Sequence, residues 1–235
     1  MARYCFSDLH GNYNLWKQIQ NYLKNDDKAF CLGDCCDRGP DGVKIMQEVL
    51  LDKRITYLKG NHEIDLIDTF TSETSLSAAE IERLKYNGVE PTIDALNKLS
   101  PQEQLNLITE LDKLPICITI ANEQGKILFL SHAGCNLQYY KQLSSQTNIA
   151  PLLWDRKHIH STHWGKQPGD ENIYIIHGHT PVQLVGQNKY RTSNVLFYCD
   201  KHKIDLDLGT PTTNKAAILN LDTFEVTYFY DIDLS

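Results

Sequence analysis

Two carboxylates and a guanidinium lie within five residues of one another in segment 33–39, which reads GDCCDRG. The segment follows a short apolar run at residues 28–32, which is typical of a buried strand. A strand that ends in Gly-Asp places the carboxylate at the carboxyl edge of a sheet, where open α/β folds bind ligands. There Asp34 can bridge two metal ions, Asp37 can orient a histidine, and Arg38 can hold a phosphate by a two-pronged contact. The alternative is a plain polar turn, because Asp and Gly are ordinary turn residues.

Polar residues also follow the other predicted strands. Together with segment 33–39, these strand ends supply seven candidate ligands or catalytic groups: Asp8, His10, Asp34, Asn61, His62, His132 and His179. A mixed set of nitrogen and oxygen donors suits Mn²⁺, Fe or Zn²⁺ better than copper or a structural zinc. Two such ions roughly 3.5–4 Å apart would clamp a phosphoryl oxygen and generate a hydroxide. We expect Asp34 to be the bridging carboxylate, because it lies between the other groups in chain order.

The cysteines offer a competing interpretation of the same segment. Cys31, Cys35 and Cys36 could form a thiolate metal site, but no second Cys/His pair sits at zinc-finger spacing. All seven cysteines together form an odd number, and most lie in apolar runs, which suits reduced thiols better than a disulfide framework. We therefore favour the oxygen and nitrogen ligands over a thiolate site.

The elements that must position these residues alternate between strands and helices. Strands are predicted at 2–7, 28–32, 55–58, 116–121, 126–131, 173–176, 195–199, 204–207, 216–221 and 225–230. Asn12 should cap a first helix, and a second should span 41–51. The repeated strand–loop–helix units indicate a layered α/β fold with helices packed on the sheet.

Residues 64–114 lack any strand pattern and are predicted to form a helical insertion beside the site, within a single domain spanning 1–235. The predicted helices are 64–70, 78–86, 92–99 and 102–114, the last with Leu105, Ile108 and Leu111 facing inward. Residues 136–170 are expected to be irregular.

Composition limits the classes of partner. The 235 residues are 41% hydrophobic and 23% charged, which is ordinary for a soluble domain. The net charge of −7 argues against a nucleic-acid binder that relies on a broad basic surface. No apolar run approaches the roughly 20 residues of a membrane span, and the N-terminus does not resemble a signal peptide. We therefore expect a cytoplasmic protein without membrane or nucleic-acid partners, and the oligomeric state stays open.

Five short motifs now support a resemblance: DLHG at 8–11, GD…DRG at 33–39, GNHE at 60–63, HAG at 132–134 and GHTP at 178–181. Together they resemble the calcineurin-like metallophosphoesterase superfamily. The DRG and NHE blocks are most similar to the phosphoprotein phosphatases, especially the bacterial and phage serine/threonine phosphatase branch. The similarity runs from residue 8 to about 210 and implies a four-layered αββα sandwich.

The resemblance also implies a role for each residue of the site. It implies that Asp8 and His10 bind one metal, that Asp34 bridges, and that Asn61, His132 and His179 bind the second metal. His62 would be the general acid, oriented by Asp37, and the phosphate would be held by Arg38 and Arg156. The chemistry agrees independently, because a leaving alkoxide needs a proton donor near neutral pH and a histidine paired with a carboxylate suits that role.

Several histidines remain outside this assignment. Pro181 stands where many members of the superfamily carry a further histidine, so the first metal should have fewer protein ligands. We favour a position behind the ligands for His177. For His158, His160 and His163 we favour a mobile polar loop over a metal cluster.

The function expected from this resemblance is hydrolysis of phosphomonoesters by direct attack of a metal-bound hydroxide. The cofactors would be two divalent ions, with Mn²⁺ expected and Fe or Zn²⁺ as alternatives. The substrate would be a phosphorylated protein, at phosphoserine or phosphothreonine, or a small-molecule phosphoester. The alternative is a symmetrical dinucleoside polyphosphate hydrolase acting on diadenosine tetraphosphate. A catalytically dead binding module is a remote alternative, since such proteins normally lack a ligand and none is missing here.

Overall fold

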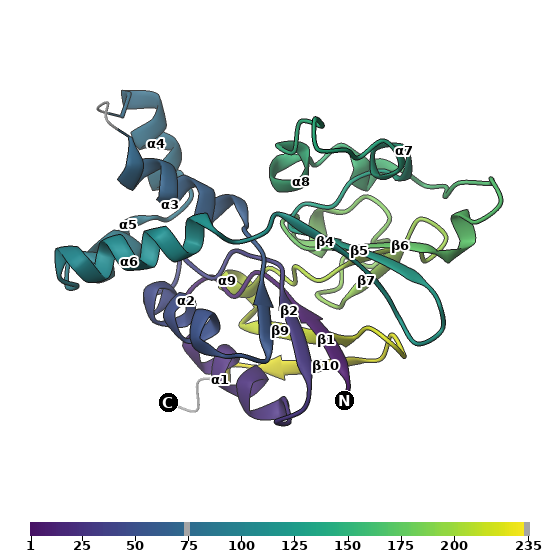
Figure 1. Ribbon diagram of the computed structural model, residues 1–235, viewed down its shortest axis with the longest axis horizontal. Helices are drawn as coiled ribbons and strands as arrows, with labels where there is room; N and C mark the ends of the chain where they lie inside the picture. The colour runs from purple at the N-terminus through teal and green to yellow at the C-terminus, as the bar shows by residue number, and fades with distance from the viewer. Residues whose placement is uncertain (73–75, 233–235) are drawn as a thin grey trace.

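Two five-stranded mixed sheets form the centre of the computed structural model, which describes residues 1–72 and 76–232 (Figure 1). The first sheet has the order β10-β9-β1-β2-β3. Its parallel strands are β1 (Arg3–Phe6), β2 (Lys28–Cys31) and β3 (Ile55–Tyr57). The antiparallel strands β9 (Lys215–Asn220) and β10 (Val226–Tyr230) complete it from the far end of the chain.

The second sheet has the order β4-β5-β6-β8-β7. The strands β5 (Ile127–Ser131), β6 (Ile173–His177) and β8 (Lys203–Asp205) run parallel. The edge strands β4 (Cys117–Ala121) and β7 (Leu196–Tyr198) are antiparallel to their neighbours. All the predicted strands are present, with ends shifted by one or two residues.

The main core lies between the two sheets, and alternation along the strands decides which residues enter it. Cys5 packs into this core with Leu130 and Ile176 of the second sheet. The next residue, Phe6, points to the opposite face and packs with Trp16 and Ile19 of helix α1 (Tyr13–Tyr22). Because successive side chains of a strand alternate, each strand of the first sheet contributes to two apolar layers.

Helix α1 begins where the sequence predicts, since the Asn12 side chain accepts a 3.0 Å hydrogen bond from the Leu15 amide. Helix α2 (Gly42–Leu51) packs beside it on the same face of the first sheet. The outer face of the second sheet is covered by the short helices α7 (Leu137–Lys141) and α8 (Pro151–Trp154) and by irregular chain. The expected α/β class is therefore confirmed. The layer that covers the outer face of the second sheet is largely irregular.

Four helices lie between β3 and β4, where the helical insertion is predicted. They are α3 (Asn61–Thr71), α4 (Ala78–Tyr86), α5 (Glu90–Leu96) and α6 (Pro101–Asp112), and Figure 1 shows them extending to one side of the sheets. The part of the predicted insertion at residues 73–75 lies outside the described residues. Helix α3 starts at Asn61, so Asn61 and His62 form its first turn rather than the end of a strand.

One inward position predicted in this region is wrong. Leu105 is 60% exposed, whereas Leu107, Ile108 and Leu111 are buried. Leu105 lies two residues, or about 200°, from Leu107 around the helix, so both cannot face the core. Elsewhere a short helix α9 (Thr210–Thr213) and 3₁₀ turns at His158–His160, Asp170–Asn172 and Val182–Leu184 were not expected. Among the described residues, no helix has the length and apolar character needed to cross a membrane.

Candidate metal centre

The loops after β1 and β2 are tied together by backbone hydrogen bonds. The Asp8 amide donates to the Gly33 carbonyl at 3.1 Å, and the His10 amide donates to the Asp34 carbonyl at 3.0 Å. On the second sheet, the Gly178 amide donates to the His132 carbonyl at 2.8 Å. Because His132 Nδ1 lies 2.9 Å from the Leu32 carbonyl oxygen, the carboxyl ends of strands from both sheets meet at one place.

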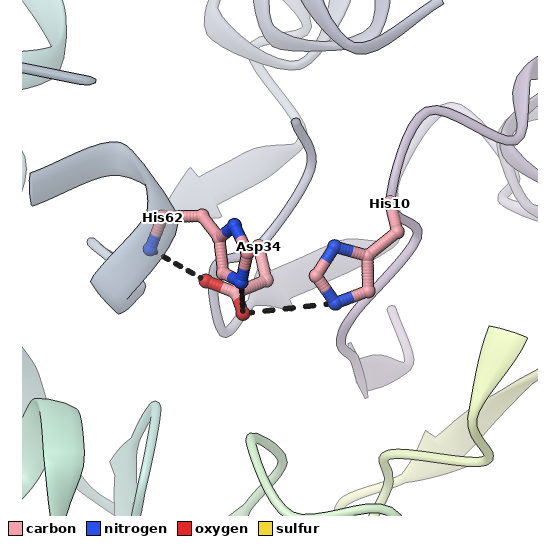
Figure 2. Close-up of side chains that lie close together, drawn as sticks. All are labelled: His10, Asp34 and His62. Atoms are coloured by element: carbon pink, nitrogen blue, oxygen red, sulfur yellow. Dashed lines mark hydrogen bonds and ion pairs between the residues drawn. The ribbon is translucent and has the colours of Figure 1, made fainter. Parts of the chain in front are cut away.

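Asp34 lies at the centre of this meeting point. Its Oδ2 atom is 3.3 Å from His132 Nε2, and it is 3.7 Å from the Nε2 atom of both His10 and His62. Its Oδ1 atom accepts a 3.1 Å hydrogen bond from the His62 amide. Figure 2 shows His10, from the loop after β1, and His62, from the first turn of α3, converging on this carboxylate. All four side chains are buried.

The remaining predicted ligands complete the cluster around Asp34. His132 Nε2 is 2.9 Å from Asn61 Oδ1 and 3.2 Å from His179 Nδ1. The Asp8 carboxylate accepts from the His179 amide at 3.2 Å and lies 4.0 Å from His10 Nε2. All six predicted metal ligands are thus neighbours in one buried cluster.

The donor set fits a dinuclear centre. The groups His10–Asp34–His62 and Asp34–His132–His179 each bring their ligand atoms within 4.8 Å of one another, and they share Asp34. His132 Nε2 and His179 Nδ1 lie close enough together that one bound cation could be coordinated by both. Mixed imidazole and carboxylate donors suit divalent transition metals. The geometry makes His62 a member of the first group, although the resemblance assigns it the role of an acid.

Burial and charge oppose each other throughout the cluster. Burial raises the pKa of Asp8 well above its ordinary value, and the neighbouring Asp207 adds to this effect. Burial also opposes ionisation of Asp34, but His132 and His62 hold its pKa well below the ordinary range. Burial disfavours protonated His132, yet Asp34 raises the pKa of His132 to about 10. A divalent cation would replace the protons that these groups share, because metal ligands must be deprotonated to bind.

His62 is oriented by Asp37, as the sequence predicts. His62 Nδ1 is 2.6 Å from Asp37 Oδ2, and both side chains are buried. Burial by itself would lower the pKa of His62, but Asp34 and the hydrogen bond to Asp37 raise it. Its other ring nitrogen, Nε2, lies 3.5 Å from Arg38 Nη2 and 3.7 Å from Asp34 Oδ2. The ring is therefore held with Nε2 toward the centre.

Two exposed arginines flank the buried cluster. Arg38 lies beside His62, and Arg156 Nε donates to His179 Nε2 at 3.2 Å. The two guanidinium groups thus adjoin different histidines of the centre. Both can reach an anionic substrate because neither is buried.

Backbone strain is concentrated in the predicted site residues. Six of them have positive φ angles without being glycine: Asp8 (55°), His10 (43°), Asp34 (56°), Asp37 (65°), Arg38 (67°) and His179 (70°). Such conformations cost free energy and persist only where the surrounding structure enforces them. Gly11 permits the close approach of the two loops, because a Cβ atom there would lie 2.4 Å from the Gly39 carbonyl oxygen. The strain supports a functional role for these loops.

Glu63 is a residue to which the sequence analysis assigns no role. It is fully buried, and its carboxylate accepts hydrogen bonds from the Asp34 and Gly60 amides at 2.8 Å, from the Cys35 amide at 2.9 Å and from the Tyr57 hydroxyl at 2.8 Å. Glu63 therefore joins the loop that carries Asp34 to the first turn of α3. The three-residue spacing from Gly60 is a capping-box spacing, which was the available signal.

Helix α5 and the turn before it also hold the loop that carries Asp37 and Arg38. The Asp37 amide donates to Thr92 Oγ1 at 2.8 Å, and the Arg38 amide donates to the Gly88 carbonyl at 2.7 Å. Thr92 is fully buried. No local pattern in the sequence relates these positions, which are about fifty residues apart.

The other histidines and the cysteines lie outside the cluster. His177 is buried behind it, with Nε2 2.8 Å from the Tyr198 hydroxyl. The prediction of a mobile polar loop is wrong for His158, which is buried against the second sheet. Its Nδ1 atom lies 3.2 Å from Lys203 Nζ. By contrast, His160 and His163 are exposed. Within the described residues, neither candidate metal group includes a cysteine.

Comparisons with known proteins agree with this geometry. The sequence pattern of the calcineurin-like phosphoesterase family matches residues 1–208. The symmetrical bis(5'-nucleosyl)-tetraphosphatase of Buchnera aphidicola (from Schizaphis graminum) is 34% identical over 140 residues, which cover 57% of this chain and 45% of that protein. The match thus spans less than half the length of that relative.

Two further comparisons extend over most of the chain. Serine/threonine-protein phosphatase 2 of Escherichia coli is 24% identical over 221 residues, covering 91% of this chain and 90% of that protein. The structure of a serine/threonine phosphatase from Saccharomyces cerevisiae superimposes with a TM-score of 0.58 at 14% identity, covering 100% of this chain and 81% of that one. The structural likeness bears on the fold alone.

Proposed function

The chain belongs to the calcineurin-like phosphoesterase family, and we propose that it hydrolyses dinucleoside polyphosphates with the help of two divalent metal ions. The observation that carries this proposal is the buried cluster centred on Asp34, with an exposed arginine adjoining it on the side of His62 and another on the side of His179. A chain of phosphates lying across such a centre would meet the Arg38 guanidinium at one side and the Arg156 guanidinium at the other. Mn²⁺ is the metal that we propose, since the donor set includes oxygen as well as nitrogen.

The residues of this chain divide the work. Asp8, His10, Asp34, Asn61, His132 and His179 would hold the ions, which when bound polarise a phosphoryl oxygen and activate water. Arg38 and Arg156 would bind the phosphate oxygens. Asp37 holds the His62 ring through Nδ1, which leaves Nε2 free to give a proton to the departing oxygen.

The choice of substrate rests on the relatives. The sequence analysis places phosphomonoesters first and dinucleoside polyphosphates second, but the more similar relatives favour the second substrate class. Phosphoprotein hydrolysis stays a second candidate because the match to the E. coli serine/threonine phosphatase covers nine-tenths of both proteins. We further propose a single domain with the helical insertion at residues 64–114.

Comparing three substrates side by side tests the proposal. The purified Mn²⁺-loaded protein should cleave diadenosine tetraphosphate with a higher kcat/KM than a phosphoserine peptide or p-nitrophenyl phosphate. Chromatography of the products distinguishes symmetrical cleavage, which yields adenosine diphosphate alone, from asymmetrical cleavage. The matched control is Asp34→Asn, purified identically, whose expected loss of several orders of magnitude in kcat sets an upper limit on the activity of any contaminant. A higher kcat/KM for the phosphopeptide would contradict the proposal and favour the second candidate.

A further inference from the structure

A polar cavity of about 320 Å³ adjoins the metal centre on the side of His10 and Arg38. Four separate segments line it: the loops at 10–14 and 38–41, the end of α9 at Pro211 and Asn214, and Asp231 after β10. Its volume lies at the lower end of the roughly 300–1,000 Å³ found for small-molecule sites. None of the roles assigned so far uses this cavity beyond its shared wall at His10 and Arg38.

The cavity is held open by contacts among its own walls. Asn12 and Asn14 each donate a side-chain hydrogen bond to the Asp231 carboxylate, at 3.1 and 3.0 Å. The Asp231 amide in turn donates to the Asn214 carbonyl at 2.8 Å. These bonds fix the end of the chain against the loop after β1, so the cavity is formed before any ligand arrives.

The chemistry of the lining favours a neutral group that carries hydroxyls. Asp41 and Asp231 place two carboxylates on the wall, and Asp41 makes no side-chain cap bond although it precedes α2. Carboxylates accept hydrogen bonds from hydroxyls but repel phosphate or an acidic peptide. Tyr13 adds an aromatic surface, fixed by a 2.7 Å hydrogen bond from its hydroxyl to Glu48.

Arg38 connects this lining to the centre. It is shared by the cavity and by the cluster, where it lies 3.5 Å from His62. A phosphate bound by Arg38 would therefore have the centre on one side and the carboxylate-lined cavity on the other. In a dinucleoside polyphosphate, each end of the phosphate chain is joined to a ribose. The paired hydroxyls of that ribose match the two carboxylates of the cavity.

We propose that this cavity binds one nucleoside of a dinucleoside polyphosphate, with its ribose hydroxyls donating to Asp41 and Asp231. The inference rests on the proposed function and adds a recognition site to it. Asp41 is then a specificity-determining residue that contacts the ribose and not the reacting phosphorus. Binding here selects nucleotides over acidic phosphopeptides. A ribose offers hydroxyl donors to the two carboxylates, whereas an acidic peptide would bring further negative charge against them.

Kinetics with a modified substrate test the proposal. The wild-type protein is assayed with diadenosine tetraphosphate and with an analogue whose riboses lack the hydroxyl pair. The wild type should show a KM roughly 10- to 100-fold higher for the analogue, as expected for hydrogen bonds to a charged acceptor. Asp41→Ala should raise the KM for the natural substrate and reduce the discrimination roughly threefold or more, while Asp231 preserves the remainder. The KM for p-nitrophenyl phosphate, which has no ribose, should stay within about twofold.

Two further variants separate recognition from structural damage. Asp41→Asn keeps the shape of the side chain and should lose part of the discrimination. Asp94→Ala, an exposed aspartate on α5, is the matched control and should behave as the wild type. Unchanged discrimination in both Asp41 variants would overturn the inference and leave dinucleotide hydrolysis standing. An equal rise of KM for p-nitrophenyl phosphate would also overturn it. A wild type that cleaves phosphopeptides but not diadenosine tetraphosphate would overturn the inference and the proposed function together.

Discussion

Replacing Glu63 by glutamine should destabilise the protein strongly, although the substitution changes only one atom. The Oε2 atom of Glu63 accepts from the backbone amides of Asp34 and Gly60, and the Oε1 atom accepts from the Cys35 amide and the Tyr57 hydroxyl. Glutamine must place an –NH₂ group at one of these two positions. The Oε1 position is less costly than Oε2, because both partners of Oε2 are backbone amides, which can only donate. At Oε1 the Tyr57 hydroxyl can rotate and accept, so that only the Cys35 amide is left facing a donor.

The magnitude follows from these four contacts. The Cys35 amide would lose its acceptor in a buried site, which costs about 1–3 kcal/mol. The bonds from Asp34 and Gly60 would change from charge-assisted to neutral, at about 1 kcal/mol each. The sum is roughly 3–5 kcal/mol, a large share of the about 5–15 kcal/mol that stabilises a typical protein.

Urea unfolding of the chelated protein measures this loss without a contribution from metal binding. With an m-value of about 3 kcal/mol/M, the midpoint should fall by roughly 1–1.7 M. Glu110→Gln is the control, because Glu110 is exposed and forms a surface ion pair with Lys113, which predicts a loss below about 0.5 kcal/mol. Metal content should also fall in Glu63→Gln, since the Asp34 loop loses its anchor. A variant within about 1 kcal/mol of the wild type that also binds metal normally would refute the reasoning.

Three further predictions concern the metal centre. Dialysis against a chelator should abolish hydrolysis, and Mn²⁺ should restore it best; full turnover in excess chelator would contradict a dinuclear centre. Asp34→Asn should lose at least one metal per chain and several orders of magnitude in kcat, because Asp34 is shared by both candidate groups; elemental analysis that finds two metals in an active variant would disprove the bridge. His62→Asn should keep its metals and lose roughly 10²–10⁴-fold in kcat with phosphoserine, but less with p-nitrophenyl phosphate, whose phenolate leaves more readily; equal losses at full metal occupancy would exclude the acid role.

Much of the site was predictable because its residues follow strands. Short apolar runs locate β1, β2, β5 and β6, and the parallel strands of one sheet place their carboxyl ends at the same edge of that sheet. The expectation that Asp8 and Asp34 lie together needs only this rule, whereas His132 follows a strand of the second sheet and joins them only when the two sheets pack. The pairing of His62 with Asp37 was expected from the resemblance, and the structure places the two side chains 2.6 Å apart.

The contacts that hold the site in shape were not predictable in this way. Thr92 of α5 binds the Asp37 amide and Gly88, in the turn before α5, binds the Arg38 amide, and nothing in the local pattern marks either residue. The exposure of Leu105 was missed for a related reason, since periodicity defines an apolar stripe but not which of several adjacent stripes meets the core.

The sequence by itself determined which side chains could take part in chemistry and at which strand ends they stand, because those properties depend on residue type and local periodicity. The tertiary structure decided the rest. It places Asp8 against His179, 171 residues away, and Asn12 against Asp231, 219 residues away. Such contacts arise only when two sheets and the end of the chain pack against one another. That packing is set by the whole core, so no single segment of the sequence specifies the cavity beside Arg38.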